Sequence, residues 1–193
     1  MHSRLDFLSA AVAEAQATIR ALDVKLAALL VAALVPVPLL ASIAECFAGI
    51  YKAWGGVFVG VTLIVFCCAW SLSIVCFALA IGAISSPAAH VKSAASYTGS
   101  LFSPGLYRFT LLDAVANRDA VLSQLEPSAH LQRLPSSEAE IESELSFEHL
   151  KLIYIRDIKL LRLRWGFRFA ASASVIGAVL NAIGRYHLKQ CGP

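Results

Sequence analysis

The chain has 193 residues, of which 58% are hydrophobic and only 15% are charged. A soluble domain carries about 25% charged residues, and a single core of this size could not hide so much apolar surface. The composition therefore excludes an ordinary soluble domain and predicts an integral membrane protein. The small net charge of +3 is unevenly placed, a pattern typical of membrane topology rather than of nucleic-acid binding.

Residues 1–25 predict a cytoplasmic amphipathic helix. Its apolar side chains recur at alternating spacings of three and four and form one stripe, which consists of Leu5, Leu8, Val12, Ala15, Ile19 and Leu22. Such a stripe needs a partner helix. We expect this helix to continue without a break into the next segment.

The first predicted membrane span is the uncharged run of residues 26–44, bounded by Lys25 and Glu45. Its nineteen residues cover about 30 Å at about 1.5 Å per residue, which matches the hydrocarbon thickness of a bilayer. Pro36 and Pro38 should kink it. A cleaved signal peptide is the competing interpretation, but the preceding 25 residues are too long and too acidic for one.

The second predicted span lies in the uncharged residues 53–84, at about 57–84, and ends at Ser85-Ser86-Pro87. Gly56 and Gly60 form a G-x-x-x-G pair, which lets helix backbones approach each other in a membrane. A single such pair arises by chance about as often as through a dimer contact, so both interpretations stay open.

Residues 85–166 predict a cytoplasmic helical region without a sheet, because few stretches alternate at period two. A short helix is expected at 106–125. A capping box, Ser137 with Glu140, then starts a long helix that no proline interrupts up to Gly184, with Gly166 as a bend. Its predicted apolar stripe consists of Phe147, Leu150, Tyr154, Ile158, Leu161 and Trp165.

Residues 167–184 form the third and weakest predicted span, followed by a tail at 185–193. The fold prediction is an all-α integral membrane protein with three transmembrane helices and a small cytoplasmic helical bundle. Ten of the sixteen Lys and Arg residues lie between His90 and Arg168, so the positive-inside rule places the N-terminus and residues 85–166 in the cytoplasm. Asp23, Lys25 and Arg168 mark the membrane boundary.

The charges of the long helix are segregated, with acidic residues first and cations at its membrane end: Arg156, Lys159, Arg162, Arg164 and Arg168. This order complements the helix dipole and puts cations beside anionic lipid headgroups. Alternatively, some of these cations face inward and bind a phosphate. The sequence leaves both interpretations open.

Catalytic motifs are missing from the sequence. It has no Walker A loop, no G-x-G-x-x-G, no H-E-x-x-H and no G-x-S-x-G, and its five histidines lack ligand spacing. The cysteines at 67, 68 and 76 lie in an apolar run and are expected to be fillers. We therefore predict no catalytic residue, no metal and no cofactor, and a protein that is not an enzyme.

Three elements carry a family resemblance: Asp23-Val24-Lys25 leading into the first span within RALDVKLAALLVAAL, SLFSPG at residues 100–105, and HLKLIYIRDIKLLRLRWGFRFAASASVIGAV. In this order they resemble the transmembrane effectors of Pycsar antiphage systems over nearly the full chain. The second element departs from the family's Phe-Phe-Gly form, with Phe102-Ser103-Pro104-Gly105 in its place.

The resemblance implies a multi-pass effector of the bacterial inner membrane, activated by a cyclic pyrimidine mononucleotide (cUMP or cCMP) from a partner cyclase, that impairs the membrane and causes abortive infection. Such a ligand needs a cation and a stacking surface, and the candidates are Arg108 with Tyr107, and Arg156 with Tyr154 and Lys159. Several protomers would have to assemble, because three spans cannot enclose a pore. The alternative is a non-enzymatic membrane anchor or scaffold that recruits a partner through its cytoplasmic helices.

Overall fold

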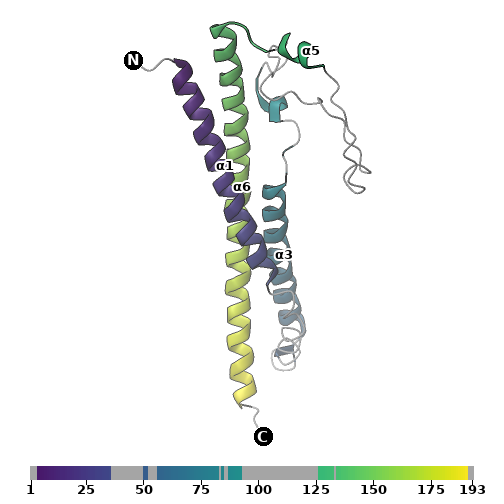
Figure 1. The fold of residues 1–193 in the computed structure, drawn as a ribbon. Helices are drawn as coiled ribbons and strands as arrows, with labels where there is room; N and C mark the ends of the chain where they lie inside the picture. Colours follow the sequence, from purple (N-terminus) through teal and green to yellow (C-terminus); the bar gives the residue numbers. More distant parts are fainter. Residues whose placement is uncertain are drawn as a thin grey trace. The chain divides into compact units, whose positions relative to one another are not determined.

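The computed structural model of the chain describes residues 4–35, 50–51, 56–82, 84, 87–92, 126–132 and 134–190. Figure 1 shows the helices in chain order: α1 (Arg4–Leu34), α3 (Gly56–Ile81), the 3-10 helix η2 (Pro87–His90), α5 (Pro127–Gln132) and α6 (Glu138–Gln190). Within these described ranges no residue forms a strand. The prediction of an all-helical protein is confirmed.

The chain divides into two compact units. Unit 1 comprises Met1–Thr18 and Ile84–Arg156, and unit 2 comprises Ile19–Ala83 and Asp157–Pro193. The helices α1 and α6 each contribute residues to both units.

The helix α1 is continuous through residue 25, as predicted, and its six-residue apolar stripe is buried or partly buried throughout. It ends at Leu34, where the N–H of Val35 donates to the carbonyl of Ala32 at 3.3 Å. Pro36 has no N–H and could not make the next helical bond to Ala32. A kinked helix through residue 44 was expected; the described helix stops before Pro36, and residues 36–44 lie outside the described residues.

The helix α3 is apolar on every side, so its sequence does not select a face. In the structure one face is buried or partly buried at alternating spacings of four and three, namely Val59, Leu63, Phe66, Trp70, Ser73, Phe77 and Ala80. This is the seam of a helix that packs in a bundle.

The helix α6 is a single helix of 53 residues that runs without interruption through Gly166, so the long helix is confirmed. Its predicted stripe is wrong in part, because Leu150, Leu161 and Trp165 are exposed. The buried row recurs every seven residues instead and consists of Leu152, Lys159, Gly166, Ala173 and Leu180. Because lysine is hydrophilic and glycine and alanine are small, these positions do not appear as an apolar stripe in the sequence, which explains the error.

Two apolar clusters hold α1, α3 and α6 together in unit 2. Leu26, Phe77 and Ala80 form one, against which Leu163 and other side chains of α1 and α6 pack. The second cluster consists of Ile50, Val59 and Leu180. The ring of Phe77 lies so close to the backbone of Gly166 that a Cβ there would be 2.6 Å from its Cε1 atom. Gly166 therefore provides a close packing position inside the helix.

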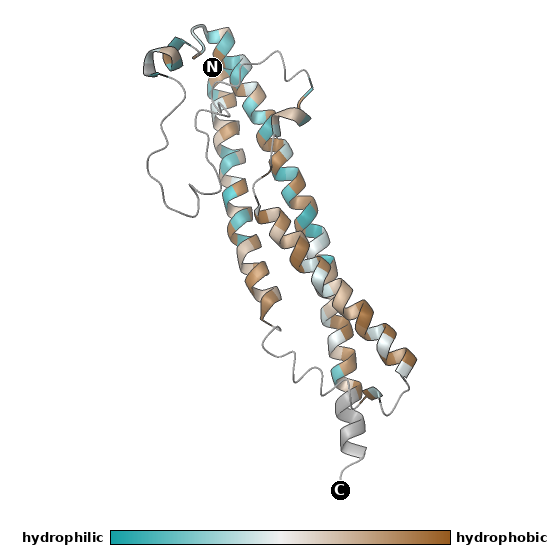
Figure 2. Ribbon diagram, turned by 90° about the vertical axis from the view of Figure 1, so that its right-hand side faces the viewer, coloured by the Kyte–Doolittle hydropathy of each residue, from teal (hydrophilic) through white to brown (hydrophobic). Residues whose placement is uncertain are grey.

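Two helices in the described part of the chain are long and apolar enough to cross a membrane: α3, and α6 from Glu138 to Ile183. Only 22% and 17% of their most apolar windows are buried within the structure, whereas a core helix of a soluble protein is mostly buried. Figure 2 shows the hydrophilic residues concentrated in the first halves of α1 and α6. The predicted span at 26–44 is described only as far as Val35.

Candidate functional site

Among the described residues, the buried charged residues all lie on α6. Four charged residues of this helix are at most 6% exposed: Glu144, Glu148, Lys151 and Lys159. Removing a charged group from water costs several kcal/mol unless a partner compensates for it. The partners of these side chains therefore define the polar sites of both units.

In unit 2 the ammonium group of Lys159 donates a hydrogen bond to the Oδ1 atom of Asp23 on α1 and forms an ion pair with it. The Lys159 side chain is 6% exposed and that of Asp23 is 41% exposed, so the pair extends from the helix interface to the surface. Sequence reasoning gave these residues separate roles, a nucleotide-binding cation and a boundary residue. The structure brings them together, and Asp23 engages the ammonium group that was expected to bind phosphate.

One turn further along α6, Arg162 contacts the end of α3. Its Nη1 atom donates to the carbonyl of Leu79 at 2.5 Å, and the N–H of Gly82 donates to the carbonyl of Ala78 at 3.0 Å. The last carbonyls of a helix lack helical donors and carry partial negative charge, so a guanidinium group stabilises them. Lys159 and Arg162 thus connect α6 to α1 and to α3, respectively.

The end of α1 receives a similar contact from α3. The indole Nε1 of Trp70 donates to the carbonyl of Ala33 at 2.8 Å. Because Ala33 lies in the last turn of α1, its carbonyl is one of those for which a helix end must find a donor elsewhere. The polar contacts of unit 2 therefore satisfy two helix ends and one buried ammonium group.

The other predicted boundary residues lie on the surface. Lys25 and Arg168 are both exposed, and the guanidinium group of Arg168 lies 5.0 Å from the centre of the Trp165 ring. This distance is within the range of a cation–π interaction. Cys67 and Cys68 are exposed on α3 and are free thiols, as is the partly buried Cys76.

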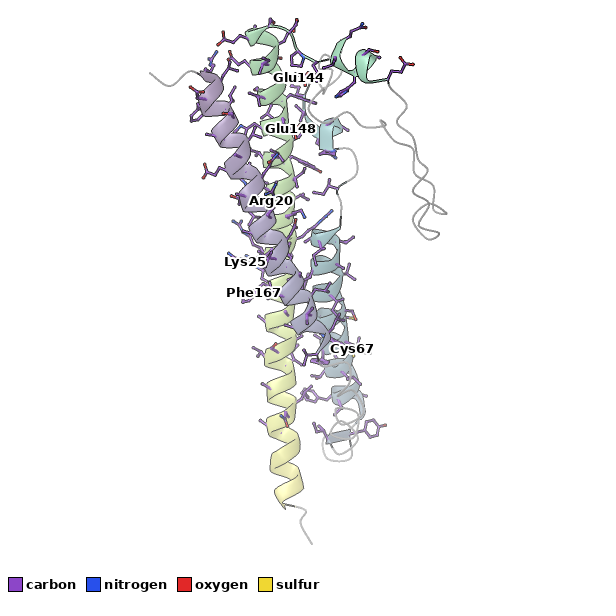
Figure 3. The ribbon with its side chains drawn as sticks, viewed as in Figure 1. Arg20, Lys25, Cys67, Glu144, Glu148 and Phe167 are labelled. Carbon is purple, nitrogen blue, oxygen red and sulfur yellow. The ribbon has the colours of Figure 1, made fainter. Side chains whose placement is uncertain are left out.

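In unit 1 the buried charges of α6 occupy a single face. Glu144, Glu148 and Lys151 follow one another at spacings of four and three residues, with the buried Phe147 beside them, and Figure 3 shows Glu144 and Glu148 on the same helix. Lys151 forms an ion pair with Glu148 and lies 5.0 Å from the centre of the Phe147 ring. At the start of the two long helices, Arg4 of α1 donates to Glu142 of α6 at 2.8 Å. This hydrogen bond joins α1 to α6 in unit 1.

Two histidines also belong to unit 1. The ring of His90 stacks on Tyr154 with centroids 4.4 Å apart and planes 15° apart. The imidazole therefore covers one face of the aromatic ring that was expected to stack beside Arg156. The Nδ1 atom of His130 on α5 is buried, with no hydrogen-bond partner among the described residues.

The predicted candidates Arg108 and Tyr107, and the expected short helix at 106–125, lie outside the described residues. Within the described ranges no group of three His, Cys, Asp or Glu side chains could hold a metal ion.

The capping box at the start of α6 is confirmed: the N–H of Ser137 donates to Glu140 Oε2 at 3.2 Å, and the N–H of Glu140 donates to Ser137 Oγ at 3.3 Å.

The carboxylate of Glu140 also accepts from the N–H of Ser136 at 2.7 Å. The backbone donors of Ser136 and Ser137, in that order of strength, hold the pKa of Glu140 below its ordinary value of 4.5.

Comparisons of the chain with protein-family models, with curated proteins and with solved structures return no match. The described structure defines the class: an all-helical protein with two helices that are long and apolar enough to cross a membrane.

Sequence reasoning missed the Asp23–Lys159 pair, the Arg162 contact with α3 and the packing of Phe77 on Gly166. A signal for two of them exists in the sequence, since Lys159 and Gly166 continue the seven-residue row of Leu152, Ala173 and Leu180. A pattern search for large apolar residues does not detect it.

Proposed function

We propose that this protein is a membrane effector in which a regulatory ligand bound to unit 1 alters the packing of the membrane helices in unit 2. One observation carries the proposal: α1 and α6 each contribute to both units, and α6 is one unbroken helix. A shift of α6 caused at the buried charges of its first half is therefore transmitted along the helix to its apolar second half, because no loop separates the two halves.

In this proposal the contacts of Lys159 and Arg162 are the element that changes between two arrangements. In one state they hold α6 against Asp23 of α1 and Leu79 of α3. In the other state these groups exchange partners and the three helices separate enough to perturb the bilayer. A ligand shifts this balance only by binding one state more tightly than the other.

The resemblance to Pycsar transmembrane effectors supports the remaining parts of the proposal. The ligand is a cyclic pyrimidine mononucleotide, cUMP or cCMP, made by a partner cyclase, and the response is membrane impairment and abortive infection. The chain crosses the bacterial inner membrane three times, with unit 1 in the cytoplasm, and it acts as a homo-oligomer without catalysing a reaction.

Arg156 and Arg108 are the cations that we propose for the ligand phosphate. Lys159 changes its role in this proposal: because Asp23 pairs with it, we assign it to the packing of α6 against α1. The stack of His90 on Tyr154 suggests how a pyrimidine base would bind, by displacing the imidazole from the phenol ring.

The test is dye entry into cells that express the full chain, measured with each cyclic mononucleotide supplied. Entry should rise with a cyclic pyrimidine nucleotide and should be lost in Arg156→Ala or Arg108→Ala, whichever residue holds the phosphate. Lys92→Ala, which removes an exposed cation of unit 1, is the control. If no cyclic nucleotide causes dye entry while the protein is present in the membrane, the effector proposal is wrong.

The second candidate function is a non-enzymatic membrane anchor or scaffold. Three large apolar side chains of unit 1 favour it, because they are exposed: Phe7 is 68% exposed, Leu131 is 67% exposed and Leu150 is 49% exposed. A scaffold would bind its partner through such side chains and would leave the membrane sealed. The dye-entry experiment therefore separates the two functions, and replacing Phe7 and Leu150 by Ser should release a scaffold's partner without changing permeability.

A further inference from the structure

Four of the five cations at the membrane end of α6 fall into two groups. Lys159 and Arg162 are engaged inside unit 2, by Asp23 and by the carbonyl of Leu79. Arg164 and Arg168 are both exposed. The two exposed arginines are four residues apart, so they lie on the same side of the helix, about one turn from each other.

Between these arginines the surface of α6 is hollowed. A depression of about 360 Å³ is lined by Leu163, Arg164, Phe167 and Arg168. Phe167 is labelled in Figure 3, and its side chain is 61% exposed. The Arg168 guanidinium lies 5.0 Å from the centre of the Trp165 ring, and Trp165 is 44% exposed. The surface of the depression is almost entirely apolar, so the two arginines line it mainly through the aliphatic carbons of their side chains.

The position of the depression along α6 adds a second argument. The sixteen residues after Arg168, residues 169–184, contain no charged side chain, and no Asp or Glu follows Asp157 in the chain. Sixteen helical residues extend about 24 Å, so Arg168 comes at the edge of the apolar stretch. Tryptophan and arginine are the side chains that membrane proteins place at this depth, where the headgroups begin.

We propose that Arg164 and Arg168 bind the phosphate of an anionic phospholipid, with its glycerol and first acyl carbons against Leu163, Phe167 and Trp165. Two guanidinium groups offer paired N–H donors that match phosphate oxygens, and no acidic side chain follows to compete for them. The inference rests on the membrane placement of unit 2 in the proposed function. According to this inference, Lys159 and Arg162 make contacts inside unit 2, whereas Arg164 and Arg168 form a lipid site.

The test uses the purified full chain and native mass spectrometry after addition of phosphatidylglycerol or phosphatidylcholine. The wild-type protein should retain phosphatidylglycerol in preference to phosphatidylcholine. In Arg164→Gln/Arg168→Gln this preference should fall by roughly tenfold or more, since each cation near the surface contributes to anionic lipid binding. Arg20→Gln/Lys92→Gln removes two exposed cations elsewhere and should keep the preference.

Arg164→Lys/Arg168→Lys keeps both charges but loses the planar donors, so an intermediate preference is expected. An unchanged preference in the glutamine variant, with its helical circular dichroism intact, would overturn the proposal. Displacement of the lipid by millimolar inorganic phosphate or cyclic UMP would overturn it too, because the site would then belong to a soluble phosphate. The dye-entry experiment tests the proposed function separately. If the wild-type chain still causes nucleotide-induced dye entry but the glutamine variant keeps the lipid preference, only the lipid-site inference is wrong.

Discussion

Lys159 on α6 and Asp23 on α1 form an ion pair inside unit 2, although 136 residues separate them in the sequence. The ammonium side is buried and the carboxylate side is partly exposed. A buried cation that loses its partner is left without compensation, so the Lys159 ammonium depends on Asp23.

Asp23→Ala should lower the free energy of unfolding in detergent micelles by about 1–3 kcal/mol, because it leaves the Lys159 ammonium buried and unpaired. Lys159→Met in the same chain should recover part of this loss, because a methionine fits an apolar interface. A denaturant titration followed by circular dichroism measures both. Glu14→Ala, on the exposed side of α1, is the control and should have little effect. Additive effects of the two substitutions would contradict the pairing.

Gly166→Ala should destabilise unit 2 by about 1–3 kcal/mol, because the added Cβ would lie 2.6 Å from Phe77 Cε1 and 2.8 Å from its Cδ1. Gly60→Ala is the matched control: nothing lies within 4 Å of its Cβ, and alanine is the better helix former, so this variant should be neutral or more stable. Adding Phe77→Leu to Gly166→Ala should restore stability. The midpoint of thermal unfolding reports all three, and equal effects of the two alanines would refute the close packing.

Trp70→Phe should lower the free energy of unfolding by about 1 kcal/mol, because the carbonyl of Ala33 loses the indole donor at 2.8 Å while the ring volume is largely kept. Trp165→Phe serves as the comparison, since Trp165 is exposed and its ring contacts Phe169 and Arg168 on its own helix. Amide exchange in the last turn of α1 should rise in the first variant alone. Unchanged exchange there would show that the indole does not hold the helix end.

The first turn of α6 should lose order in acid. The pKa of Glu140 is lowered in the folded chain, so its contribution is present above the ordinary value of 4.5 and is lost as the pH falls through the lower folded value. Hydrogen exchange at the amides of Ser136, Ser137 and Glu140 should accelerate over that range. Glu140→Gln should remove this pH dependence, and a wild-type profile that stays flat below pH 4.5 would contradict the assigned hydrogen bonds.

The start of α6 and the stripe of α1 could be predicted because each depends on neighbours in the chain. A capping box links residues three apart, and the stripe from Leu5 to Leu22 joins residues on consecutive turns. The unbroken course of α6 likewise follows from the absence of proline between Ser136 and Gly184. Local stereochemistry determines such features before any tertiary contact forms.

The sequence predicted which charged residues the candidate site contains, but not how they are arranged. The sequence identified Asp23, Lys159 and Arg168 as charges near apolar runs, but it could not decide which of them face a partner helix. Helices that are apolar on every side, such as α3, offer no pattern from which a packing face can be derived. Large side chains also misled the assignment on α6, since Leu161 and Trp165 are exposed while Lys159 and Gly166 are buried.

The sequence by itself determined that the chain is helical and that its charges are segregated along α6. Of the three membrane spans that it predicted, those within α3 and α6 lie on described helices that are long and apolar enough to cross a membrane. Tertiary structure decided that Lys159 is neutralised by Asp23, that Arg162 stabilises the end of α3, and that Gly166 is the packing site for Phe77. The physical reason is that hydropathy and capping are properties of residues close in the chain. The partner of a buried ammonium group and the space beside a glycine are set by the helices that pack against them.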